Sequence, residues 1–211
     1  DAHAFAQELT DRSLTLIGGG AASLPVALHR GPVLRVLSIG YADSRRAEIN
    51  EVFDHELERV GGFVRAIRLW ERSDDDDLER VREAAREADV VVFASYARAL
   101  PWKGDLGLPA DVAELAGELA RQGAIVVGFG DPYVLGQLPG DGAYLLAWTD
   151  SDAAQRAAAR AIAGRIPVTG RLPVTVPPLY TIGDGISLPM LADQVPAAAE
   201  LAEPVSSSER P

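Results

Sequence analysis

The residues best suited to chemistry lie in one long segment, Ser95 to Pro109, which reads SYARALPWKGDLGLP. A connection of this length between regular elements is often functional. It brings together Trp102, Lys103 and Asp105. An indole ring can stack on a sugar, while a lysine and an aspartate can hydrogen-bond its hydroxyls. The same groups suit contact with a neighbouring domain, and a tryptophan can also fill a gap in its own core. The residue types alone leave these alternatives open.

Other common chemistries find little support in the sequence. It contains no G-x-G-x-x-G after a strand-like run, no phosphate-binding G-x-x-x-x-G-K-[ST] and no G-x-S-x-G elbow. The run IGGGA at 17–21 is interpreted as a turn. The acidic run at 72–80 does not fit the glycine at position six and the glutamate at position twelve of a calcium loop, so it predicts a helix start capped at Ser73. The three histidines are far apart in sequence. We therefore predict no metal and no cofactor.

Composition limits the class of protein. The 211 residues are 47% hydrophobic, which is enough for one sizeable core. A net charge of -11 argues against nucleic acid and anionic membranes as partners. No apolar run approaches the roughly 20 residues of a membrane span. The absence of cysteine excludes disulfides and leaves the compartment open. Because the sequence starts at Asp1 rather than methionine, we expect it to be a piece of a longer protein.

Strand-like and helical segments alternate along the chain, which predicts a doubly wound α/β fold. The strand-like runs are Val33–Ile39, Phe63–Leu69, Val90–Ala94, Ala124–Phe129 and Ala143–Ala147. Several are apolar on both faces, which is typical of parallel strands covered by helices on both sides. Apolar stripes of helical period occupy 44–60, 75–88 and 110–121, and an alanine-rich helix follows at 151–163, capped by Asp150 or Ser151.

These patterns predict a three-layer α/β/α sandwich around a mostly parallel sheet of five or six strands, flavodoxin-like or Rossmann-like. Residues 2–9 are expected to be helical. Ser13–Ile17 is a candidate early strand and Leu172–Val176 a candidate late edge strand, since the Pro177–Pro178 pair that follows cannot continue a central strand. We expect one domain over 1–189 and a linker or flexible tail over 190–211.

Ligands of open parallel sheets bind at the carboxyl ends of the strands. The loops expected there are Gly40–Ser44, Ser95–Leu108, Gly130–Leu138 and Trp148–Ser151. Clustered exposed aromatic side chains commonly mark a partner surface. The sequence therefore predicts a substrate-binding or interface site at this edge of the sheet. Its candidate residues are Tyr96, Trp102, Lys103, Asp105, Asp131, Tyr133 and Trp148.

Several stretches, in order, resemble the C-terminal α/β domain of family 3 glycoside hydrolases, most closely the β-N-acetylhexosaminidase branch. They are RSLTLI at 12–17, ADVVVFASYARALPWKGDLGLP at 88–109, GAIVVGFGDPYVL at 123–135 and SDAAQRAAARAIAGRIPVTGRLPVTVP at 151–177. The last stretch is the most specific. The resemblance covers roughly residues 10 to 189.

The resemblance implies an accessory domain that packs on an N-terminal (β/α)8 barrel of the same polypeptide, with an N-acetylglucosaminide as substrate. It places the nucleophilic aspartate on that barrel. The β-glucosidase branch of the family takes its acid/base glutamate from the 95–109 loop, at the position of Pro101 in this chain. Proline cannot donate a proton, so we predict no catalytic residue here and a histidine donor on the barrel. The resemblance also favours a periplasmic or secreted location.

Two other functions fit the sequence. One is a free-standing, flavodoxin-like domain that binds a small molecule. The other is a structural module that orients a further domain.

Overall fold

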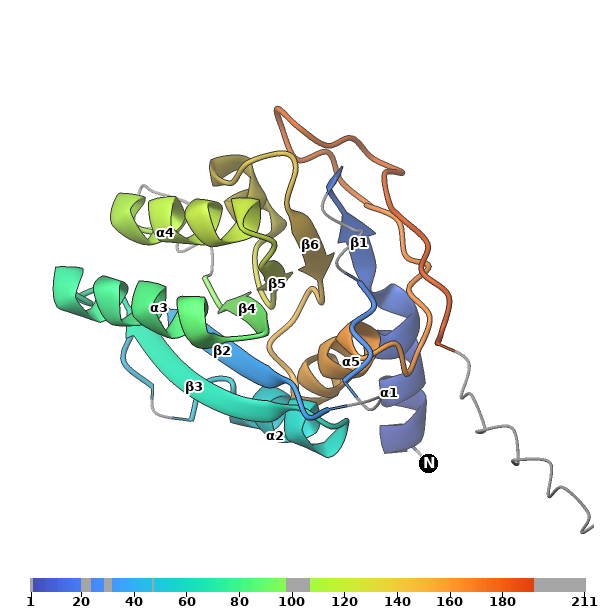
Figure 1. The fold of residues 1–211 in the computed structure, drawn as a ribbon. Coiled ribbons are helices and arrows are strands. Elements are labelled where there is room, and N and C mark those ends of the chain that lie inside the picture. Colours follow the sequence, from blue (N-terminus) through green and yellow to red (C-terminus); the bar gives the residue numbers. More distant parts are fainter. Residues whose placement is uncertain (1, 20–23, 29–31, 47, 98–106, 192–211) are drawn as a thin grey trace, which may run out of the picture.

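The computed structural model describes residues 2–19, 24–28, 32–46, 48–97 and 107–191 (Figure 1). A single six-stranded sheet forms its centre, in the order β1-β6-β5-β4-β2-β3. The five strands from β2 onward run parallel, and β1 pairs antiparallel with β6 at one edge. The strands are β1 (Thr15–Ile17), β2 (Arg35–Ala42), β3 (Phe63–Trp70), β4 (Val90–Ser95), β5 (Ile125–Gly128) and β6 (Ala143–Leu146).

Helices cover both faces of the sheet, so the predicted α/β/α fold class is confirmed (Figure 1). The layer on one face contains α1 (Ala2–Ser13), α2 (Glu51–Arg59) and α5 (Asp152–Ile162). The layer on the other face contains α3 (Asp75–Glu87), α4 (Ala110–Arg121) and the short 3-10 helix η2 (Pro132–Gln137). Each layer has its own apolar core against the sheet. The two cores explain why the central strands are apolar on both faces. No helix in the described part of the chain is long and apolar enough to cross a membrane.

Of the two helix caps predicted from the sequence, one differs in the structure and one does not. The cap of α3 is Asp74 rather than Ser73, and its carboxylate accepts a hydrogen bond from the backbone N–H of Asp77 at 3.0 Å. The Ser73 hydroxyl instead accepts one from the backbone N–H of Trp70, which closes the turn after β3. The predicted cap of α5 at Ser151 is confirmed. The acidic run is thus a capped helix start with its carboxylates at the positive end of the helix dipole.

The predicted late edge strand at Leu172–Val176 is wrong. The segment folds back on itself, with Val176 and Tyr180 exchanging two backbone hydrogen bonds of 2.8 and 3.0 Å. Prolines at 173, 177 and 178 remove three N–H donors from the segment, so it cannot form a regular ladder. The side chains of Leu172, Val176 and Tyr180 are nevertheless buried against the core beneath α4 and η2.

An exposed ion pair joins the starts of β2 and β4. The Arg35 guanidinium donates two hydrogen bonds to the Asp89 carboxylate, and the Arg35 backbone N–H donates a third. These bonds, the side-chain ones first, lower the pKa of Asp89 to about 2. Because this value lies below that of the unfolded chain, the contribution of Asp89 to stability is present above about pH 4 and is lost as the pH falls toward 2.

Carboxyl-carbon NMR titration of Asp89 should therefore give a pKa of about 2. In Arg35→Ala the pKa should rise toward the ordinary aspartate value of 3.8 without reaching it, since the backbone N–H bond remains. An unchanged pKa in the variant would show that the guanidinium is not its main cause.

Candidate functional site

A buried network of polar side chains lies toward the carboxyl edge of the sheet. It joins Ser38 on β2, Asn50 and Asp54 at and near the start of α2, Arg68 on β3 and Tyr96 just after β4. Its members come from four segments that are distant in sequence. The network therefore fastens the loop after β2, the α2 helix and the exit from β4 to one another.

Asn50 is the centre of this network. Its amide N–H group donates to the Ser38 hydroxyl at 2.8 Å and to Asp54 at 3.0 Å, and its carbonyl oxygen accepts from the Tyr96 hydroxyl at 2.6 Å. Its backbone has φ 73, a left-handed conformation that asparagine tolerates better than most residues. The side chain is fully buried, so each of these bonds replaces one with water. Asn50 thereby fixes the turn that enters α2.

Asp54 and Arg68 form the charged part of the network. The Asp54 carboxylate accepts from the Ser38 hydroxyl and pairs with the Arg68 guanidinium. Burial raises the pKa of Asp54 above its ordinary value, and the Ser38 hydroxyl and the Arg68 charge oppose that shift. The Arg68 Nε has no hydrogen-bond partner among the residues that the structure describes. The pair holds β3 to α2, since Asp54 is nearly buried and Arg68 is only partly exposed.

The side chain of Tyr96 lies inside the domain. It is 2% exposed, and its ring stacks on Phe129 with centroids 4.8 Å apart. Phe129 in turn contacts Phe53 edge-on at 5.5 Å. Burial raises the pKa of Tyr96, so the hydroxyl stays protonated and can donate to Asn50. Tyr96 thus supports the loops from within rather than presenting its ring at the surface.

Three other candidates lie at the ends of β5 and β6. Asp131 caps η2 by accepting a hydrogen bond from the backbone N–H of Tyr133 at 2.9 Å. The side chain of Tyr133 is 45% exposed. Trp148 is half-buried, and its indole N–H donates to the Ser13 carbonyl at 2.9 Å, which ties the exit of β6 to the end of α1. Of the described candidates, Tyr133 presents the most surface.

The remaining candidates, Trp102, Lys103 and Asp105, lie outside the described residues, but the chain on both sides of them is fixed. On one side, the Ala97 carbonyl accepts from the backbone N–H of Asp131 at 3.2 Å. On the other, the Gln137 side chain forms two hydrogen bonds, of 2.8 and 3.1 Å, with the backbone of Leu108. The described residues on both sides of 98–106 are therefore bonded to the loop that contains η2, Ala97 at Asp131 and Leu108 at Gln137.

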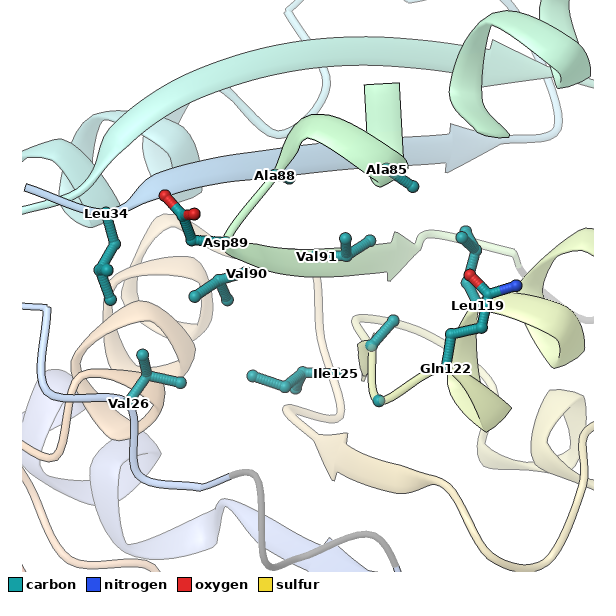
Figure 2. Close-up of a pocket in the computed structure, with 12 residues that line it drawn as sticks. Val26, Leu34, Ala85, Ala88, Asp89, Val90, Val91, Leu119, Gln122 and Ile125 are labelled. Carbon is teal, nitrogen blue, oxygen red and sulfur yellow. The ribbon is translucent and has the colours of Figure 1, made fainter. Parts of the chain in front are cut away.

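A groove of about 450 Å³ lies at the opposite, amino edge of the sheet (Figure 2). Most of its lining side chains are apolar, and the polar Asp89 among them is held by Arg35. Two of its lining residues, Val26 and Leu34, flank residues 29–31, which lie outside the described part. Ligands of parallel sheets bind at the other edge. We assign no site to this groove.

The described side chains at the carboxyl edge can position a loop and offer an aromatic surface. Within the described ranges no group of three or more histidine, aspartate or glutamate side chains could hold a metal ion. Asp131 is engaged as a helix cap, and Asp54 is engaged in the buried network.

The model of the glycosyl hydrolase family 3 C-terminal domain matches residues 8–203. The chain belongs to this family. The match spans nearly the whole chain. It includes every strand and every helix of the described part except residues 2–7 of α1. No curated protein sequence gives a significant match.

Solved structures share the fold of this family 3 domain. A fungal multi-domain β-N-acetylglucosaminidase aligns with TM-score 0.67 at 23% identity over 89% of this chain. A β-N-acetylglucosaminidase from Paenibacillus sp. str. FPU-7 aligns with TM-score 0.58 at 20% identity over 83% of it. A β-glucosidase from Listeria innocua aligns with TM-score 0.62 at 19% identity over 82% of it. The family 3 domain spans only 20%, 32% and 26%, respectively, of these proteins.

The Tyr96 hydrogen bond gives a test of the buried network in this family 3 domain. Tyr96→Phe removes the donor and leaves the Asn50 carbonyl oxygen buried without its partner, so we expect a loss of about 1–3 kcal/mol in the free energy of unfolding. The matched control is Tyr133→Phe, whose hydroxyl belongs to an exposed ring and should change stability by less than about 0.5 kcal/mol. Equal losses in urea denaturation would mean that the buried bond adds nothing.

Proposed function

We propose that this chain is the accessory C-terminal domain of a retaining β-N-acetylglucosaminidase-like glycoside hydrolase. In this proposal it packs on an N-terminal (β/α)8 barrel of the same polypeptide and walls one side of the sugar site. The observation that carries the proposal is the family match over residues 8–203. The domain's length, a fifth to a third of the aligned structures, fits one domain of a larger enzyme.

The carboxyl edge of the sheet is the surface that would meet the barrel. The loop after β4 is fixed at both of its described ends beside η2, and Tyr133 adds an exposed aromatic ring there. Exposed aromatic residues are enriched in interfaces. In the proposal Trp102, Lys103 and Asp105 contact the substrate or a barrel loop, while Asp131, Tyr133 and Trp148 shape the contact. Tyr96 supports this surface from within, through its hydrogen bond to Asn50 in the buried network.

The assignment of catalysis to the barrel rests on Pro101. Glycoside hydrolysis uses a proton donor and, in retaining enzymes, a carboxylate nucleophile close to it. General-acid catalysis contributes about 10²- to 10⁴-fold, so an enzyme of this class would need a donor from elsewhere. A barrel histidine is that donor in our proposal, which favours N-acetylglucosaminides over glucosides. The isolated chain is then inactive.

Hydrogen exchange tests the docking surface. The polypeptide that carries this domain and the isolated domain should be compared by amide exchange and mass spectrometry. We expect slower exchange in the longer polypeptide for peptides covering 130–138 and 148–151, because a docked barrel shields these loops. Peptides covering 85–91 and 119–125 at the amino edge serve as the internal control and should not change. Protection confined to the amino edge would place the interface on the wrong side of the sheet.

A further inference from the structure

A hollow of about 580 Å³ lies beside the carboxyl end of β3 and is lined by five arginines. Arg45 and Arg46 come from the loop after β2, Arg68 and Arg72 from the end of β3 and the turn after it, and Arg80 from α3. These are five of the 19 arginines of the chain. The chain has a net charge of -11, so such a concentration of positive charge is not a general property of its surface.

Acidic side chains neutralise only part of this charge. Two aspartates, Asp74 and Asp77, also line the hollow. Arg80 pairs with Asp77 at 3.0 Å, and Arg68 pairs with Asp54 beneath the hollow. Arg45 and Arg46 are exposed, and neither forms an ion pair with any residue that the structure describes.

Several guanidinium donors are thus available to a ligand. The Arg72 guanidinium lies 6.0 Å from the centre of the Trp70 ring, a cation–π contact that does not use its N–H donors. The Arg68 guanidinium is paired with Asp54 and its Nε is buried, so Arg68 adds positive charge to the hollow rather than a free donor. Together with the two arginines of the loop after β2, the hollow offers free donors from two separate segments.

We propose that this hollow binds the phosphate group of a small soluble ligand. Guanidinium groups match phosphate oxygens in a bidentate, charge-assisted manner, and arginine is the preferred residue for such recognition. The volume lies within the range of small-molecule sites, so it accommodates a phosphorylated metabolite rather than the anion alone. The site belongs to this chain and does not rest on the proposed glycosidase function.

The acidic residues nearby affect how binding should depend on conditions. Asp75 and Asp76 lie in the first turn of α3, next to the capping Asp74. They weaken the long-range attraction of an anion, so affinity depends on direct contacts with the guanidinium groups. Exposed charges are screened by salt, with a Debye length of about 8 Å at 0.15 M. Affinity should therefore fall as salt concentration rises.

NMR titration of the ¹⁵N-labelled chain tests the site with defined probes: inorganic phosphate, glucose 6-phosphate and, as the neutral control, glucose. We expect the two phosphates to shift backbone amides of residues 43–46 and 70–77 in a saturable manner, and glucose to shift none. Absence of saturable shifts in these segments at about 20 mM phosphate would overturn the proposal, since that concentration detects even millimolar affinity.

A pair of double variants separates direct contact from net charge. Arg45→Ala/Arg46→Ala should weaken glucose 6-phosphate binding at least about tenfold, because two charge-assisted contacts are removed. The control Arg12→Ala/Arg121→Ala removes the same charge from exposed positions on α1 and α4 and should change affinity less than about twofold. Equal weakening by both variants would overturn the proposal.

Vesicles distinguish a soluble phosphate from a lipid headgroup. With phosphatidylglycerol vesicles, we expect no co-sedimentation of the chain at 0.15 M salt, since the net charge of the chain is strongly negative. Sedimentation with vesicles but no response to glucose 6-phosphate would overturn the assignment to a soluble ligand.

Discussion

Replacing Asp54 with alanine is expected to lower the free energy of unfolding by about 3–5 kcal/mol, because it leaves the largely buried Arg68 charge without its partner. The Ser38 hydroxyl and the Asn50 amide lose an acceptor at the same time. Asp54→Asn keeps the shape of the side chain and its hydrogen-bonding oxygen, so it should cost less than alanine. Urea denaturation of the three proteins gives these differences.

The exposed pair of Arg35 and Asp89 provides the matched control. Asp89→Ala also removes a carboxylate bound to an arginine, but both partners are in contact with water. Exposed ion pairs contribute only about 0–1 kcal/mol. A loss in Asp54→Ala no larger than that in Asp89→Ala would contradict the role assigned to the buried network.

Phe129→Ala is expected to cost about 3–5 kcal/mol, the usual range for a fully buried phenylalanine. The Phe129 side chain is 1% exposed and contacts the rings of Phe53 and Tyr96. Its removal opens a cavity between the end of β5, the α2 helix and the exit from β4. The loss of the stacked partner of Tyr96 should also loosen the loop that follows β4.

Phe63→Ala is the control for this substitution. Phe63 begins the edge strand β3 and is 66% exposed, so its truncation should change the free energy of unfolding by less than about 0.5 kcal/mol. Amide exchange of residues 94–97 should accelerate in Phe129→Ala and not in Phe63→Ala. Similar stabilities of the two variants would mean that the aromatic cluster does not hold this end of the sheet.

Four of the parallel strands, β2, β4, β5 and β6, were predictable because the chain buries them on both faces. A run such as VVVFA at 90–94 needs apolar side chains toward both helix layers. This apolar run is visible in the sequence even when the neighbouring strands are not known. All five predicted strands from Val33–Ile39 onward are confirmed, as β2 to β6, and the early strand is the antiparallel β1. The alanine-rich α5 was likewise predictable from its periodicity and its Ser151 cap.

The closing segment shows where local pattern fails. Leu172–Val176 has strand-like residues, and three of them are buried or half-buried. Whether such a run joins the sheet depends on a free edge beside it. β1 occupies the edge next to β6, and its bridge to the later part of the described chain joins Leu16 to Ile186, beyond residues 172–176. The prolines then direct the segment into its own turn.

The two polar clusters near the carboxyl edge could not be predicted, because they depend on strand order. β2 lies between β4 and β3 in the sheet, which brings Ser38, Asn50 and Tyr96 together and places the Arg45–Arg46 loop beside β3. The positions of these residues along the sequence do not indicate that they lie close together in the fold. The one available signal was Ser38, a hydroxyl within the otherwise apolar interior of β2.

The predicted site residues were chosen from loop position, which identifies an edge of the sheet but not which way a side chain points. Tyr96 and the 98–106 segment both follow β4 in the sequence, and the ring of Tyr96 is buried. Asp131 and Tyr133 both follow β5, but Asp131 caps a helix and Tyr133 is exposed. Their contacts with a sugar or a barrel stay a prediction.

The measurement that tests the central claim most directly is a comparison of hydrolysis by the purified chain and by the polypeptide that carries it. An aryl N-acetyl-β-glucosaminide and an aryl β-glucoside serve as substrates. We expect turnover by the longer polypeptide, with preference for the N-acetylglucosaminide, and none by the isolated chain. Turnover by the isolated chain that survives repurification and scales with protein concentration would contradict this expectation, because the catalytic groups would then lie within these 211 residues.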